Sequence, residues 1–503
     1  MSNTSTVLGK RSQSAKAYGP SGATLVEVIH TGIRLRPDLG RVITKPFLAH
    51  TGGLPDSQER LRRIAQHTID LDQETIEGTL EDLRKGFQTR HRDIEAIWES
   101  NLSFIGQVLP DIAQVSDRSL RLLLGATFTQ EYAIEGAALT NPSIVSVGGS
   151  DFILSLRAIG EGHISSIEFR SGRQRSDGEI EIDSPGPYAA AGRRSEVLFE
   201  RDRFASKLAQ MDAEDEIADE VLGLLPQQFD STELGHALKT VTSKDRVHPL
   251  QAETTTHVFR WLASSNYELV FDNEPLSERV LFPAGPSDSN GMEDARFVRF
   301  TEDDGSVTYF ATYTAFDGIR ILPQLISTAD FVRFRVSSLH GSCAQNKGMA
   351  LFPRRIDGKF VALSRHDQTN LHVLWAEEVW DWNLAERLTV PKAPWEAVQV
   401  GNCGSPIETA AGWLVITHGV GPMRTYRLGA LLLDLEEPER IVGRLQEPLL
   451  SPDWSDRDGY VPNVVYSCGS LIHEGRLLLP YGIADREVGI GVVDVDRLLA
   501  AMA

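Results

Sequence analysis

A repeated pattern of a turn glycine followed by a strand that ends in a polar residue constrains the fold of this chain more than any other feature. Five glycines precede such strands: Gly149, Gly305, Gly358, Gly412 and Gly475. The last four recur every 53 to 63 residues, close to the period of about 50 residues of four-stranded propeller blades. The pattern predicts an all-β core built as a five-bladed β-propeller, although any large antiparallel β protein contains similar hairpins.

The polar residues at the ends of these strands are expected to share one pocket. Blades that meet around an axis bring equivalent strand ends together, however far apart they lie in the sequence. The five strands end at Arg157, Asp317, Arg365, His418 and Asp485. Carboxylates suit general acid work and the binding of sugar hydroxyls, whereas arginine and histidine suit an oxyanion such as phosphate. The strand ends therefore predict a pocket of mixed charge.

Two stretches of helical periodicity interrupt the β pattern. Residues 57–125 place apolar residues at helical spacing amid heavy charge, which is typical of amphipathic helices with solvated faces. A loop and a helical insertion separate the first repeat from the second. The expected organisation is a disordered tail over 1–22, an N-terminal strand (24–36) and helical region over 23–136, a first propeller segment over 137–172, the insertion over 173–274, and the remaining blades over 275–503.

Residues 291–318 hold a dense group of chemically active side chains. Two runs rich in β-branched and aromatic residues flank Asp303-Asp304-Gly305, a tight-turn signal, and so predict a β-hairpin. At one end of this hairpin stand Glu293, Asp294 and Arg296 before it, and Phe316 and Asp317 after it. Grouped carboxylates beside aromatic rings suit proton transfer onto a sugar. A plain salt bridge of the arginine and a turn aspartate at 317 would explain the same residues.

Composition and missing motifs exclude several classes of function. A net charge of −20 argues against nucleic acid as a general partner, because binding phosphates needs a basic face. No apolar run approaches the roughly 20 residues that span a bilayer, and the polar, basic N-terminus is not typical of a secretory signal, so a cytoplasmic protein with no membrane partner is expected. Three scattered cysteines and no histidine pair at ligand spacing indicate neither disulfides nor a metal site. The motifs of serine hydrolases, P-loop enzymes and dehydrogenases are missing.

Eight short motifs follow one another along the chain. They are 141–143 (NPS), 291–296 (GMEDAR), 313–318 (YTAFDG), 346–347 (NK), 412–420 (GWLVITHGV), 426–429 (YRLG), 460–466 (YVPNVVY) and 481–485 (YGIAD). This series resembles that of glycoside hydrolase family 130, which contains mannoside phosphorylases and β-mannosidases on a five-bladed β-propeller. The resemblance covers about residues 137–172 and 275–500, and leaves the helical stretches outside.

The resemblance implies an inverting glycoside phosphorylase. Such an enzyme would cleave a β-mannosyl di- or oligosaccharide with inorganic phosphate as co-substrate, and would release α-mannose 1-phosphate without a cofactor or metal. Asp317 matches the family's general acid, which protonates the glycosidic oxygen through a hydroxyl of the mannosyl ring while phosphate attacks the opposite face. No second carboxylate is needed as base, because phosphate is already the nucleophile.

Further site residues combine this resemblance with the residue types at the strand ends. The residues expected to bind substrate are Asn141, Arg157, Glu293, Asp294, Arg296, Phe316, His418, Tyr466 and Asp485. The residues expected to bind phosphate are Arg365, Lys347, Arg387 and Arg424. The sequence departs from the family at Ala295, where proline is usual, and at Phe316, where tyrosine is common. Arg387 and Arg424 lie near basic positions of the family but do not align with them securely.

Two other functions remain compatible with the sequence. The hydrolytic branch of the family uses glutamates to activate water, and Glu293, Glu377, Glu378 and Glu408 are available for that role. A non-catalytic carbohydrate-binding propeller, with the added helices as an interaction surface, is the third hypothesis. Residues 57–125 are expected either to mediate a homo-oligomer or to wall off one side of the sugar site.

Overall fold

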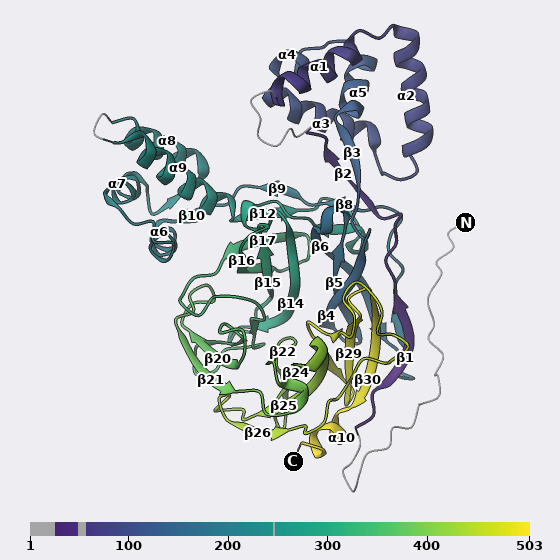
Figure 1. Cartoon of the computed structure of the whole chain (residues 1–503), viewed down its shortest axis with the longest axis vertical. Helices are drawn as coiled ribbons and strands as arrows, with labels where there is room; N and C mark the ends of the chain where they lie inside the picture. Colours follow the sequence, from purple (N-terminus) through teal and green to yellow (C-terminus); the bar gives the residue numbers. More distant parts are fainter. Residues whose placement is uncertain (1–25, 49–56, 245–246, 503) are drawn as a thin grey trace. The chain divides into compact units, whose positions relative to one another are not determined.

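The computed structural model describes residues 26–48, 57–244 and 247–502, which form two compact units. The larger unit contains residues 26–37, 137–184 and 192–502, and consists mostly of strands with some helices (Figure 1). The smaller unit contains residues 38–136 and 185–191, and is mostly helical. The expected tail over residues 1–22 lies outside the described residues.

All five strands predicted from the glycine repeat are present in the larger unit. They are β5 (Asp151–Ile159), β15 (Val307–Phe316), β19 (Phe360–Ser364), β24 (Gly412–Gly421) and β29 (Arg476–Ile483). Each pairs antiparallel with the strand before it. All five turn glycines have a positive φ, a conformation that costs other residues energy. The repeat therefore marks the second strand of each antiparallel group.

One continuous sheet contains the first two groups of strands. Its path runs β4-β5-β6-β14-β15-β16-β17-β12-β9, and β7 and β13 both pair with β6. The bounds are β4 (Ala138–Gly148), β6 (Ser165–Gln174), β7 (Ile180–Ile182), β9 (Arg193–Ser195), β12 (Tyr267–Val270), β13 (Arg279–Leu281), β14 (Gly291–Thr301), β16 (Ile321–Thr328) and β17 (Arg333–Ser338).

Two separate sheets follow. The first has the order β18-β19-β20-β21, and the second has the order β22-β24-β25-β26 with β23 also paired to β24. The bounds are β18 (Ala350–Leu351), β20 (Leu371–Ala376), β21 (Leu384–Thr389), β22 (Gln399–Asn402), β23 (Ile407–Thr409), β25 (Thr425–Leu433) and β26 (Ile441–Arg444).

The last sheet joins the two ends of the larger unit. Strand β1 (Ile29–Leu35), which falls within the strand expected at 24–36, pairs antiparallel with β30 (Glu487–Asp494). β30 continues through β29 to β27 (Val465–Tyr466), and β28 (Leu471–His473) also pairs with β29. Helix α10 (Val495–Ala500) follows. An N-terminal strand thus completes a sheet whose other strands come from the C-terminal part of the chain.

Neighbouring sheets of the larger unit contact one another in a cyclic order. β14 contacts β18, β20 contacts β22, β25 contacts β27, and β29 contacts β4. The packed faces are apolar: Trp413 and Phe352, for example, lie edge to face with ring centroids 5.0 Å apart in one buried cluster. The repeated antiparallel sheets are confirmed. Strand pairing alone does not establish a closed five-bladed ring, which stays a prediction.

In the described part of the predicted helical insertion, four helices accompany a two-stranded pair, and Figure 1 shows the helices grouped together. The elements are β10 (Phe199–Glu200), α6 (Arg201–Gln210), α7 (Glu216–Leu224), β11 (Gln228–Phe229), α8 (Ser231–Thr242) and α9 (Pro249–Ser264). Asp230 and Glu233 form a capping box that begins α8. Phe199, Phe204 and Phe229 pack in a buried cluster of this insertion.

The smaller unit has its own buried core. Its elements are β2 (Val42–Pro46), α1 (Ser57–Ile69), α2 (Gln73–Phe87), α3 (Ile94–Val108), α4 (Pro110–Ala113), α5 (Arg118–Thr127), β3 (Thr129–Ala133) and β8 (Ala190–Ala191). Aspartates cap α2, α3 and α5, and Leu102, Leu124 and Phe128 are among the fully buried residues between the helices. Within the described residues, the length and polarity of every helix rule it out as a membrane span.

Candidate active site

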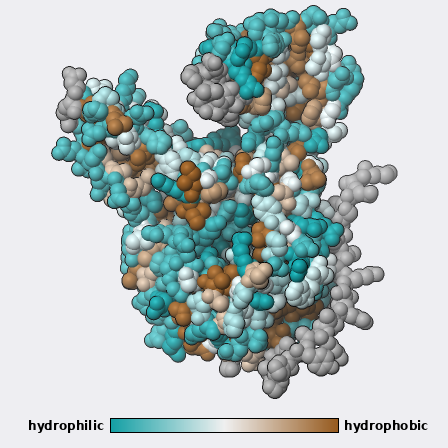
Figure 2. Space-filling view, viewed as in Figure 1, coloured by the Kyte–Doolittle hydropathy of each residue, from teal (hydrophilic) through white to brown (hydrophobic). Residues whose placement is uncertain are grey.

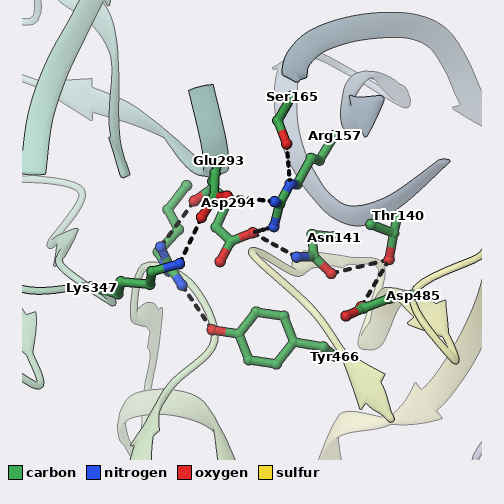
Figure 3. Close-up of polar contacts among 10 residues, drawn as sticks. Thr140, Asn141, Arg157, Ser165, Glu293, Asp294, Lys347, Tyr466 and Asp485 are labelled. Carbon is green, nitrogen blue, oxygen red and sulfur yellow. Dashed lines mark hydrogen bonds and ion pairs between the residues drawn. The ribbon is translucent and has the colours of Figure 1, made fainter. Parts of the chain in front are cut away.

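A network of charged and polar side chains lies where β4, β5 and β14 of the larger unit meet (Figure 3). Asp294 stands at its centre, and its Oδ1 accepts hydrogen bonds from Asn141 Nδ2 at 2.5 Å and from Arg157 Nη1 at 3.0 Å. Asn141 and Asp294 both sit where the strand register shifts, and both have a positive φ. Such irregularities turn a side chain away from its regular direction, and they cluster at functional sites. Here they direct the two side chains toward each other.

Arg157 is held by three partners. Its Nη2 donates to Glu293 Oε1 at 2.7 Å and its Nε donates to Ser165 Oγ at 2.9 Å, in addition to the bond to Asp294. Lys347 Nζ donates to the other oxygen of Glu293 at 2.6 Å. Glu293 therefore bridges two cations. Because every nitrogen of Arg157 is engaged, its guanidinium plane is fixed.

The two aspartates of the network differ in their affinity for a proton. Burial disfavours ionisation of Asp294, but the positive charges of Arg157, Lys347 and Arg296 outweigh it and hold the pKa of Asp294 well below its usual range. Burial raises the pKa of Asp485 to about 6, against the opposing charge of Arg157. Thr140 Oγ1 lies 3.1 Å from Asn141 Oδ1 and 3.2 Å from Asp485 Oδ1, and so links Asn141 to Asp485. Asp294 is ionised at neutral pH, whereas Asp485 binds a proton when the pH falls to about 6.

Arg296 connects this network to the later sheets. Its side chain is 1% exposed, and it donates to the carbonyl oxygens of Asp294 and Cys403, each at 2.9 Å, and to Tyr466 Oη at 2.8 Å. His418 packs on Tyr466 with ring centroids 4.9 Å apart and is also 1% exposed. Burial and the nearby arginines lower the pKa of His418 well below its usual range. This histidine is therefore neutral and supports Tyr466 from within the protein.

Arg365 carries a positive charge without a carboxylate partner among the described residues. Its Nη1 donates to Gln399 Oε1 at 2.7 Å and to the carbonyl of Gln368 at 3.2 Å, whereas its buried Nε has no hydrogen-bond partner there. Gln399 also lies 3.5 Å from His418 Nε2. A buried N–H group nearly always has an acceptor. The Arg365 side chain is therefore suited to receive the oxygen of an anion.

Four expected site residues form no hydrogen bond with this network in the described residues, although the charge of Arg424 acts on Asp485. Asp317 Oδ1 accepts the backbone N–H groups of Ile319 at 2.8 Å and Arg320 at 2.5 Å, as a turn aspartate does. Phe316, at the end of β15, is half-buried. Arg387 is exposed on β21, the last strand of its sheet, and Arg424 is exposed beside the ring of Tyr426. Within the described part of the chain, no hydrogen bond joins these four residues to the network, and their roles stay predictions.

The glutamates considered for a hydrolytic mechanism are mostly at the surface. Glu408 forms an exposed ion pair with Arg354, Glu377 is 77% exposed beside Lys359, and Glu378 is exposed. Only Glu293 of the four belongs to the network, where it is bound by two cations. No group of residues suited to hold a metal ion occurs in the described ranges.

Three side chains of these contacts were not predicted from the sequence. Thr140 directly precedes the NPS motif, Ser165 begins β6, and Gln399 begins β22. Small polar residues are common in strands, so only Thr140, beside a recognised motif, carried a usable signal.

In the space-filling view, the surface of the larger unit is hollowed near its middle, and hydrophilic residues line the hollow (Figure 2).

Comparisons with known proteins point to one family. The model of glycoside hydrolase family 130, described as beta-1,4-mannooligosaccharide phosphorylase, matches residues 264–503. A 1,2-beta-oligomannan phosphorylase of Thermoanaerobacter sp. is 33% identical over 229 residues, which cover 44% of this chain and 74% of that protein. A beta-1,2-mannobiose phosphorylase of the same organism is 29% identical over 267 residues, covering 50% and 83%.

A solved structure is similar over a longer stretch. The beta-1,2-mannobiose phosphorylase of Listeria innocua, in complex with beta-1,2-mannobiose, covers 73% of this chain and 93% of its own at 18% identity, with a TM-score of 0.45. The family match includes the network residues on β14 as well as Asp317, Arg365 and Asp485.

Proposed function

Because this chain belongs to glycoside hydrolase family 130, the family of the mannoside phosphorylases, we propose that it cleaves a β-mannoside with inorganic phosphate and releases α-mannose 1-phosphate. The observation that carries this proposal is Arg365, a guanidinium with a buried, unpartnered Nε and no carboxylate partner among the described residues. An oxyanion is the natural ligand for such a group. The relatives are named for β-1,2 and β-1,4 mannosides, so disaccharides of both linkages are candidate substrates.

The proposed step needs one acid and one nucleophile. Asp317 protonates the glycosidic oxygen through a hydroxyl of the mannosyl ring, and the bond from the anomeric carbon to that oxygen breaks, so that the leaving sugar departs with a free hydroxyl. A phosphate oxygen bonds to the anomeric carbon from the opposite face. Asp317 follows Phe316, which pairs with Gly291, so it lies three positions along the hairpin from Glu293, about 10 Å away. That separation suits a bound sugar ring between the acid and the network.

Phosphorolysis fits the charges of the site better than hydrolysis. An inverting hydrolase needs a second carboxylate to activate water. Glu293 is the single glutamate of the four considered that belongs to the network, and Arg157 and Lys347 neutralise it there. A phosphorylase needs no such base, since phosphate carries its own negative charge.

The scaffold in this proposal is a five-bladed β-propeller. Its support is the cyclic order of contacts between the sheets and the pairing of β1 with β30, which ties the N-terminal strand to the last sheet. Strand ends from different sheets then converge, as Arg157 and Asp485 do beside Asp294.

A phosphate-dependence assay tests the function. The full-length protein is incubated with β-1,2- and β-1,4-linked mannobiose, with and without phosphate, and mannose 1-phosphate and free mannose are measured. We expect mannose 1-phosphate to form with at least one disaccharide, and only when phosphate is present. Equal cleavage without phosphate, yielding free mannose, would replace this proposal with a β-mannosidase.

The variant Asp317→Asn separates an enzyme from a carbohydrate-binding protein. We expect turnover to fall by about 10²-fold or more, as on loss of a general acid, while the fold and disaccharide affinity persist. Asp303→Asn, which changes an exposed aspartate in the turn of the same hairpin, is the matched control and should retain turnover. Unchanged turnover in Asp317→Asn would remove this residue from the role of acid.

A further inference from the structure

A second group of basic side chains lies between helix α6 of the helical insertion and strand β17 of the larger unit. Arg203 and Lys207 on α6, Arg335 on β17 and the following His340 line a common pocket. Figure 1 shows α6 to α9 grouped at the end of the larger unit where β9 and β12 lie. β17 is three strands from β14, about 14 Å across the sheet, so this pocket is separate from the network around Asp294.

The three cations of this pocket are held by backbone carbonyl groups. Each cation donates a hydrogen bond to a backbone carbonyl: Arg203 to Ser338 at 3.3 Å, Lys207 to Leu339 at 2.6 Å, and Arg335 to Leu198 at 3.2 Å. Across the described ranges, none of the three forms an ion pair within 4.0 Å. Glu200 also lines the pocket, and it acts on Arg203 together with Glu378, whereas Asp381 acts on Lys207, in each case without an ion pair within 4.0 Å.

Three basic groups of the pocket have lowered pKa values. Burial lowers the pKa of Lys207 to about 8, and burial together with the charge of Arg335 lowers that of Arg203 to about 10. Burial and these two cations lower the pKa of His340 to about 3, so its ring is neutral. The pocket therefore favours the arrival of negative charge.

His340 adds an unpartnered polar atom. Its side chain is 3% exposed, and its Nδ1 has no hydrogen-bond partner within the described part of the chain. Buried polar atoms of proteins are almost always hydrogen-bonded to protein, water or ligand. Since His340 lines the pocket, a ligand there would supply the partner that the chain itself does not.

We propose that this pocket binds a phosphoryl oxyanion, with Arg203, Lys207 and Arg335 as its ionic partners and His340 as a hydrogen-bond donor. The cavity of about 50 Å³ has room for a few water molecules, and so for one tetrahedral oxyanion but not for a sugar ring. The ligand is inorganic phosphate or the phosphate end of a sugar phosphate. This inference does not depend on the proposed function, because it rests on other residues.

Calorimetric titration of the full-length protein tests the site. The probes are inorganic phosphate and mannose 1-phosphate, and the variants are Lys207→Gln and Arg335→Gln. We expect each variant to lose one equivalent of binding or to bind there about tenfold or more weakly, because a charge-assisted hydrogen bond is removed. Tighter binding of one probe than the other at this site identifies the source of the phosphoryl group.

Arg333→Gln is the matched control. Arg333 lies two residues earlier on β17 and carries the same charge, but it pairs with Glu268 and does not line the pocket. We expect this variant to bind as the wild type does. Equal binding by Arg333→Gln, Arg335→Gln and Lys207→Gln would overturn the proposal. Arg365→Gln reports separately on the co-substrate site, so failure of one proposal is distinguishable from failure of the other.

The number of protons taken up when an anion binds gives a second test, which does not depend on a variant that has lost binding. Sulfate is the probe here, because it does not titrate near pH 8. A bound anion raises the pKa of Lys207, so binding at pH 8 should take up about half a proton per site. His340 and Arg203 have pKa values of about 3 and about 10, far from that pH, so they add little. Lys207→Arg should retain binding and lose the uptake, and equal uptake in this variant would overturn the role of Lys207.

Discussion

Asp294 and Asp485 lie in one polar network, but the pKa of Asp294 is lowered and that of Asp485 is raised. Asp294 faces Arg157 and Asn141 directly, so its charge is compensated by bonds to both. Among the side chains that the structure describes, only the hydroxyl of Thr140 forms a hydrogen bond with Asp485, and burial dominates the pKa of this carboxyl. The first carboxylate therefore fixes the geometry of the site, whereas the second carries a destabilising charge at neutral pH. Carboxyl groups with such raised pKa values cluster at functional sites.

Asp485→Asn should make the protein more stable at pH 7 and less active. The pKa of Asp485 is about 6 in the folded chain and about 3.9 for an unfolded aspartate, so the folded state binds a proton more tightly. The stabilisation that protonated Asp485 gives the wild type is fully present below about pH 4, and it is lost as the pH rises through about 6. Discounted for partial exposure, Asp485→Asn should gain about 1 kcal/mol at pH 7 and nothing at pH 4.

Urea unfolding at the two pH values measures this difference, and a disaccharide assay measures the loss of activity. Asp458→Asn is the control, since Asp458 is 93% exposed and should not alter stability at either pH. A stability gain of the same size at pH 4 as at pH 7 would contradict an origin in the ionised carboxylate.

At the level of strands and turns, the glycines of the repeat differ in how much space surrounds them. A Cβ at Gly305, with φ of 83°, would meet nothing within 4 Å, whereas a Cβ at Gly412, with φ of 141°, would lie 2.3 Å from the carbonyl oxygen of Leu433. Gly305→Ala should therefore cost only the strain of its backbone, about 1 kcal/mol, and Gly412→Ala about 3 kcal/mol or more. Chemical denaturation of both variants tests this order, and equal losses would contradict it.

The sequence predicted those parts of the fold that local signals encode. A glycine in a left-handed turn followed by β-branched and aromatic residues is a short-range pattern, and all five such strands are present. The pairing of β1 with β30 joins residues more than 450 positions apart, and no local pattern specifies it. The register shifts at Asn141 and Asp294 depend likewise on how distant strands fit together, and so were not predicted.

The same distinction applies to the candidate site. Residue type and position at a strand end identified Arg157 and Asp485, which do lie beside Asp294. Burial is a property of the packed chain, and it makes His418 a support for Tyr466 although its residue type suggested contact with substrate. The bond of Lys347 to Glu293, which neutralises the one glutamate of the network, also appears only in the structure.

At the scale of the whole molecule, the chain contains two units with separate cores. Every residue of the network, and Arg365 with its partners, belongs to the larger unit. The smaller unit buries residues such as Leu102, Leu124 and Phe128 among its own helices. A role for residues 57–125 in a homo-oligomer or beside the sugar site stays a prediction, and it can be tested by destabilising one core at a time.

Leu124→Ala in the smaller unit and Leu414→Ala in the larger unit form a matched pair. Both side chains are fully buried, and each substitution should cost about 2–5 kcal/mol within its own unit. Calorimetry should show a transition that shifts for Leu124→Ala while phosphorolysis at 25 °C is retained, whereas Leu414→Ala should lower thermal stability and activity together. If Leu124→Ala loses activity in step with its unfolding, the helical unit contributes to the site. If the particle mass falls with it, the unit holds an oligomer together.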